Sequence, residues 1–88
     1  MTLTLSGDWR DAAEMTLALL QSGFRLEFAP ASVTEAKPRL VAIARNEDFP
    51  LFGRGWLAWL RVDDPALTLA AYQRGARAVF PPDMPPSL

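Results

Sequence analysis

The sequence contains no cysteine and no histidine among its 88 residues. The first absence excludes disulfides and thiolate chemistry, and the second removes the commonest general base and the commonest metal ligand. No apolar run approaches the roughly 18 residues that a membrane span requires. The first ten residues also lack the basic and apolar stretches of a secretory signal. We therefore expect a cytoplasmic domain with no membrane partner.

A strong charge of either sign is missing as well, because the net charge is −1. The basic residues are scattered along the chain, and we interpret them as a compositional bias toward arginine. Because the sequence has no basic patch, we predict no direct contact with nucleic acid. Half of the residues are hydrophobic, which fits one compact domain with some apolar surface left for a partner.

Five segments have the pattern of β-strands. They are residues 2–6, 24–29, 40–44, 56–62 and 76–80. In the first segment Leu3 and Leu5 share one face, which predicts a strand with one buried side. In the second, alternation predicts that Leu26 and Phe28 point inward. The run "LVAIA" (40–44) is continuously apolar and predicts a central strand buried on both faces.

Two helices are predicted between these strands. Asp8 is a good N-cap for the first, and Gly23 is placed to end it in the left-handed conformation. The second begins with Asp64 at its N-cap and Pro65 at its first position, and Gly75 is expected to stop it after about residue 74. Between Pro30 and Pro38, the segment 31–37 has room for only one or two helical turns.

Strands that alternate with helices predict a mostly parallel sheet with right-handed crossovers. The fold class expected is α/β, a small flavodoxin-like sheet with strand order 2-1-3-4-5 and reduced helices. We assign residues 1–80 to this domain. Residues 81–88, "PPDMPPSL", are rich in proline and predict a tail or linker.

The last third of this pattern, "LTLAAYQRGARAVFPP" (67–82), resembles the receiver domains of two-component response regulators. Gly75 and Ala76 match the Gly-Ala pair that ends the receiver's fourth helix, and residues 78–80 match its fifth strand. Pro82 falls on the proline that follows a cis peptide bond in receivers. Pro81 falls where the family has its lysine.

The other positions that receivers use for phosphoryl transfer are also altered. The two adjacent Mg²⁺-binding acids are reduced to Asp8, and the phospho-acceptor aspartate falls on Asn46 or Ala44, depending on the anchor chosen. The hydroxyl residue after the fourth strand falls on Arg61 or Val62. The resemblance thus implies a pseudo-receiver without catalytic, metal or cofactor sites, acting as a regulatory or dimerisation module. It further implies the N-terminal part of a bacterial transcriptional regulator.

The second helix carries the candidate interface. Leu67 and Ala71 lie on one stripe of the helix, whereas Leu69 and Tyr72 lie on another. One interpretation buries the whole apolar helix in the core. The other exposes the side with Leu69 and Tyr72 to a second subunit, which agrees with receivers, because they pair near their fourth helix and fifth strand. The candidate interface residues are Leu67, Leu69, Tyr72, Gln73 and Phe80. The partner is a second copy of the chain or another protein domain.

Two further features leave alternatives open. Trp56 and Trp59 are three residues apart, so we expect them on opposite faces of one strand, in the core or, for one of them, at an interface. The acids Glu47, Asp48, Asp63 and Asp64 follow the third and fourth strands and offer a ligand- or metal-sensing alternative at the carboxyl edge of the sheet. A stand-alone adaptor is the other alternative. No nucleophile–base pair has a recognisable spacing, so we expect no enzyme.

Overall fold

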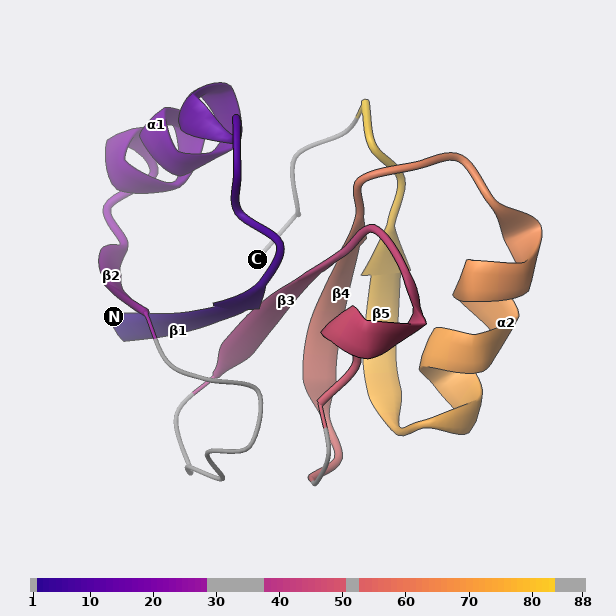
Figure 1. The fold of residues 1–88 in the computed structure, drawn as a ribbon. Coiled ribbons are helices and arrows are strands. Elements are labelled where there is room, and N and C mark those ends of the chain that lie inside the picture. Colours follow the sequence, from indigo (N-terminus) through magenta and orange to yellow (C-terminus); the bar gives the residue numbers. More distant parts are fainter. Residues whose placement is uncertain (1, 29–37, 51–52, 84–88) are drawn as a thin grey trace.

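The computed structural model describes residues 2–28, 38–50 and 53–83, in which one sheet carries an α-helix on each face (Figure 1). The strands are β1 (Thr2–Gly7), β2 (Arg25–Phe28), β3 (Arg39–Ile43), β4 (Trp56–Leu60) and β5 (Ala76–Phe80). The helices are α1 (Ala13–Gln21), α2 (Pro65–Gln73) and the short 3-10 helix η1 (Asn46–Asp48). The short helix expected in segment 31–37 lies outside the described residues.

The strand order is β2-β1-β3-β4-β5, and every neighbouring pair is parallel. This confirms the predicted α/β class and the order 2-1-3-4-5. The arrangement is that of flavodoxin-like folds, in which the chain reverses its direction of travel across the sheet at the first strand. The carboxyl ends of all five strands therefore meet at one edge of the sheet.

The middle of the sheet is buried on both faces. All five residues of β3 are buried, as the continuous apolar run predicts. The prediction of one buried side for β1 was wrong, because Thr4 and Ser6 are buried as well as Leu3 and Leu5. β1 lies inside the sheet between β2 and β3, and its two polar residues are buried on the face opposite Leu3 and Leu5.

Two separate apolar clusters hold the helices to the sheet. The α2 side contains Val41, Ile43, Phe49, Trp56, Ala58, Leu60, Leu67, Ala71 and Ala76. The α1 side contains Leu3, Leu5, Ala12, Met15, Leu19, Leu40, Ala42 and Trp59. The two tryptophans of β4 thus lie in the core on opposite faces, as their odd spacing along a strand predicts.

The ends of α2 follow the predicted chemistry. The Asp64 carboxylate accepts a hydrogen bond from the backbone N–H of Ala66 at 3.0 Å, and Pro65 is the first helical residue. The chain leaves the helix through Gly75, whose φ of 103° is in the left-handed region. Gly23 does the same after α1, with a φ of 92°. These signals were predictable because caps depend on local geometry alone.

The prediction that Asp8 caps α1 was wrong. The helix begins at Ala13, and its N-cap residue Ala12 makes no side-chain cap hydrogen bond. The Asp8 carboxylate instead accepts hydrogen bonds from the backbone and side chain of Arg10. A nearby arginine therefore competes successfully for the carboxylate, and the chain needs four further residues before the helix starts.

Phe28 was predicted to point into the core, and it is instead largely exposed. It lies on the α1 side of the sheet, paired with Leu5 of β1. The β2 strand is an edge of the sheet, so less of the molecule covers it. Among the described aromatic residues, Trp9 makes an edge contact with Phe28, with ring centroids 6.4 Å apart.

Two further findings concern the peptide bonds and the helix lengths of the described residues. Between described residues every peptide bond is trans, including the one before Pro82, so the cis bond implied by the receiver resemblance is not found. No helix in the described ranges is long and apolar enough to cross a membrane.

Candidate functional site

The carboxyl edge of the sheet brings together the residues that directly follow its strands. Asp8 follows β1 directly, Ala44 follows β3, Arg61 follows β4 and Pro81 follows β5. Asn46, the other position considered for the phospho-acceptor, begins η1. The fold therefore gathers the residues that the receiver resemblance matches to phosphoryl-transfer positions, and their chemistry differs from that of a receiver.

An arginine crosses this edge. The Arg61 guanidinium donates a hydrogen bond to the backbone carbonyl of Asp8 at 2.7 Å and lies 3.9 Å from the Asp8 carboxylate. Because β3 lies between β1 and β4, the side chain spans the end of β3 to make this contact. A cation of the chain itself thus lies beside Asp8, where a receiver binds Mg²⁺.

Asp8 is also held by a second arginine. The Arg10 side chain donates to both carboxylate oxygens, at 3.1 and 2.9 Å, and the Arg10 backbone N–H donates as well. These hydrogen bonds lower the pKa of Asp8 from its ordinary value of 3.8 to about 2, and the charge of Arg61 adds to the effect. The carboxylate is therefore ionised and occupied by donors over the whole physiological pH range.

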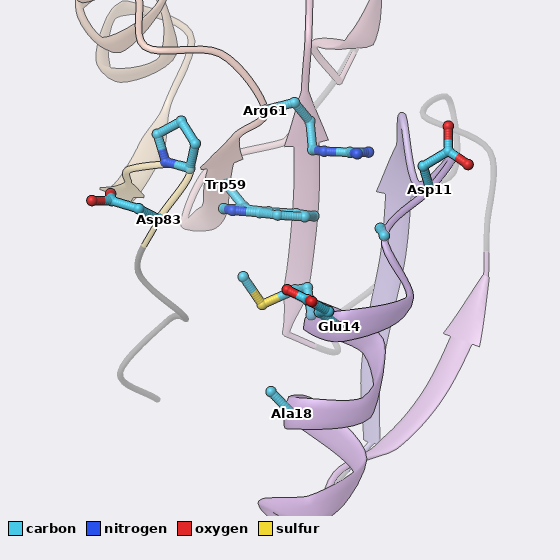
Figure 2. A pocket seen from close by; sticks show the side chains of 9 residues that line it. Asp11, Glu14, Ala18, Trp59, Arg61 and Asp83 are labelled. Carbon is cyan, nitrogen blue, oxygen red and sulfur yellow. The ribbon is translucent and has the colours of Figure 1, made fainter.

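The Trp59 indole packs against the Arg61 guanidinium. The Arg61 guanidinium lies 4.9 Å from the centroid of the Trp59 ring, a cation–π geometry, and Figure 2 shows it stacked along the indole. Trp9 packs against the same ring system with centroids 5.2 Å apart. Two aromatic rings and an internal ion cluster thus fix the geometry of the carboxyl edge.

Two of the four acids proposed as an alternative ligand set make hydrogen bonds within the chain, and the other two are exposed. Asp48 accepts hydrogen bonds from the backbone N–H groups of Ala44 and Arg45, at 2.8 and 3.1 Å, and Asp64 caps α2. Glu47 and Asp63 are exposed to solvent. No group of three or more acids in the described ranges is close enough together to hold a metal ion.

The outer surface of α2 is apolar. Leu69 is 61 % exposed and Tyr72 is 51 % exposed, and Gln73 beside them is exposed too. We call these three residues the α2 outer surface. The whole helix, "PALTLAAYQ", contains no charged residue, although about half of it faces solvent. Depletion of charge together with an exposed aromatic side chain is typical of the core of protein interfaces.

The remaining two interface candidates lie elsewhere. Leu67 is buried against the sheet, so its side chain holds α2 in place and is not available to a partner. Phe80 is half-buried on the opposite, α1 side of the sheet, packed against the cluster that contains Trp59. The structure therefore groups Leu69, Tyr72 and Gln73 together and separates Leu67 and Phe80 from them.

Comparison with known proteins yields no relative. No protein-family model matches the chain, and neither the curated proteins nor the solved structures contain a significant match. The fold assignment therefore depends on the strand order and on the parallel pairing.

Two important residues were missed by sequence reasoning. In the sequence, Arg61 and Arg10 belong to a scattered set of basic residues, yet both bind Asp8. One signal could have indicated Arg61. It lies two residues after Trp59 and thus on the same side of the strand, directly after a buried apolar run. The role of Arg10 has no such signal, because it depends on the turn at residues 8–12.

Proposed function

We propose that this chain is a pseudo-receiver, a regulatory module that associates with a second copy of itself through the α2 outer surface. The observation that carries the proposal is the exposure of Leu69 and Tyr72 on a helix without charged residues. Tyrosine is enriched at interface hot spots, and fully burying an exposed leucine side chain is worth about 1.5 to 3 kcal/mol.

The changed carboxyl edge supports a role without phosphoryl transfer. A receiver needs an acceptor aspartate, a pair of acids for Mg²⁺ and a lysine, and here the corresponding positions hold Ala44 or Asn46, a single Asp8 and Pro81. Arg61 and Arg10 occupy that single acid. Regulation would therefore depend on association, and not on the phosphorylation state of this domain.

The geometry of α2 suits a symmetric pair. A nine-residue helix is about 13 Å long, so two copies can pack antiparallel with Leu69 of one against Tyr72 of the other. Such an isologous contact uses the same patch twice. The buried positions Leu67 and Ala71 anchor the helix to β4 and β5, which keeps the outer surface rigid before association and lowers the entropic cost of binding.

The biological setting follows from the receiver resemblance. We place the domain in the cytoplasm, in the N-terminal part of a bacterial transcriptional regulator, with the proline-rich segment 81–88 leading to an effector domain. In this setting the module itself does not contact DNA. A stand-alone adaptor that binds a different protein through the same surface is the second candidate, and it too is favoured by the apolar α2 outer surface.

Sedimentation equilibrium of the 88-residue chain and of its Leu69→Glu and Tyr72→Glu variants tests the proposal. At a two-fold interface each substitution buries two unpaired carboxylates, one from each copy, against apolar side chains, and we expect the dissociation constant to rise about 30-fold or more. Leu17→Glu is the matched control, because Leu17 on α1 is 55 % exposed and lies outside α2. A monomer at all concentrations would contradict self-association and favour the adaptor.

A further inference from the structure

A cavity of about 470 Å³ opens on the α1 side of the sheet, remote from the α2 outer surface (Figure 2). Its walls come from α1 and the two residues before it, from the end of β4 and from the residues that follow β5. The lining residues are Asp11, Ala12, Glu14, Met15, Ala18, Trp59, Arg61, Pro82 and Asp83. The volume lies within the range of about 300 to 1,000 Å³ that is usual for small-molecule sites.

The indole of Trp59 contains an unused hydrogen-bond donor in this wall. Trp59 is only 6 % exposed, and its Nε1–H has no acceptor among the described residues. The other two indoles are satisfied: Trp9 donates to the Ser6 carbonyl at 2.7 Å and Trp56 to the Arg74 carbonyl at 3.4 Å. Buried donors are nearly always paired in folded proteins, so an acceptor is expected at Trp59. Figure 2 shows the nitrogen end of this ring directed toward the side on which Asp83 lies.

The charged groups at the cavity are mostly acids without partners. Glu14 and Asp83 make no hydrogen bond or ion pair with any described residue, whereas Arg61 is already bound to Asp8. Glu14 is also favoured where it is by the positive end of the α1 dipole. No helix dipole explains the position of Asp83, because Asp83 follows a strand. Met15 and Ala18 add an apolar surface to the same cavity.

We propose that this cavity binds an organic cation, an alkylammonium or guanidinium group on an apolar stem that also carries an acceptor oxygen. The stem lies on Met15 and Ala18 beneath the Trp59 indole, the cation pairs with Glu14 and Asp83, and the oxygen accepts the Trp59 Nε1–H. The same chemistry can come from a free small amine or from a lysine or arginine side chain of a partner protein. This inference is independent of self-association through α2.

Nitrogen–proton correlation NMR of the full chain tests the inference, because the three indole N–H groups are separate probes. Aminovaleramide, with a cation, a stem and a carbonyl, is titrated to about 20 mM, in the range of weak binding. Valeramide, which lacks only the amine, is the control compound. We expect the Trp59 resonance to shift with aminovaleramide, valeramide to bind at least about fivefold more weakly, and the Trp9 and Trp56 resonances to stay in place.

Variants identify the groups responsible. Glu14→Gln and Asp83→Asn should each weaken aminovaleramide binding about three- to fivefold, the effect of one exposed ion pair. Asp63→Asn is the matched control, since Asp63 is an exposed acid outside the cavity, and it should not change the binding of aminovaleramide.

A blocked alanine–lysine–alanine peptide distinguishes the two sources of the ligand. If the peptide binds as tightly as aminovaleramide or more tightly, the source is a partner side chain, and if aminovaleramide binds more tightly, the source is a free amine.

Four results would overturn the inference: no shift of the Trp59 resonance, equal binding of valeramide, equal shifts at all three indoles, or no effect of the two variants. A fifth result would overturn it as well, namely that the Asp83 carboxylate accepts the indole proton. In that case Asp83→Ala would move the Trp59 resonance without any added compound, and the missing acceptor would no longer support a ligand.

Discussion

Replacing Arg61 with methionine should destabilise the fold by about 2 to 4 kcal/mol. The guanidinium donates to the Asp8 carbonyl at 2.7 Å, and a hydrogen bond to a charged group contributes about 1.5 to 3 kcal/mol. Loss of the cation over Trp59 adds about 0.5 to 1 kcal/mol. Methionine preserves most of the apolar stem on the indole, so packing changes little. For a chain of this size the whole stability is on the order of 4 to 13 kcal/mol, and the loss would be easy to measure.

Urea unfolding followed by tryptophan fluorescence is the assay, and Arg10→Met is the matched control. Both arginines bind Asp8, but the side chain of Arg10 is 75 % exposed and that of Arg61 only 19 %. Solvent screens the Arg10 pair, so its replacement should have a much smaller effect. With an unchanged slope near 1 kcal/mol/M, Arg61→Met lowers the midpoint by about 2 M or more. Equal midpoints for the two variants would refute the assignment of Arg61 as the link across the carboxyl edge.

Two further predictions concern the same end of β1. Gly7→Ala should lower the free energy of unfolding in urea by about 3 kcal/mol or more, because its φ is +87° and a Cβ would lie 2.1 Å from the Ala42 carbonyl oxygen. Gly23→Ala is the control: it has a similar φ but open space around it, and should cost only about 1 kcal/mol. Similar costs for the two variants would refute the close approach at Gly7. The pKa of Asp8 is about 2 in the folded chain against an ordinary 3.8, so its stabilising contribution is complete above about pH 4 and is lost as pH falls toward 2. The stability difference between the wild type and Asp8→Asn should therefore shrink over that window, and a difference that grows on acidification would contradict the sign.

The sheet was predictable because its signals are local and repeated. Apolar runs at β3 and β4, the Asp64–Pro65 helix start and the glycines after both helices each specify structure over a few residues. Alternation with helices then restricts the topology to a parallel sheet. The odd spacing of Trp56 and Trp59 correctly placed them on opposite faces, because strand geometry leaves no other choice.

The site was less predictable because it depends on side chains from distant parts of the chain. Asp8 looked like a helix cap, and nothing local reveals that Arg61, 53 positions away, reaches its carbonyl. Phe28 has the alternation of an inward residue, yet an edge strand has less cover than a central one. The cavity beside Trp59 combines α1, β4 and the residues after β5, and no sequence window contains all three.

The central claim is self-association through α2, and the solution mass of the chain tests it most directly. Sedimentation equilibrium over a concentration series should give a dimer that Leu69→Glu and Tyr72→Glu dissociate and that Leu17→Glu leaves intact. A mass that stays monomeric throughout, or a dimer that survives both α2 substitutions, would contradict the account.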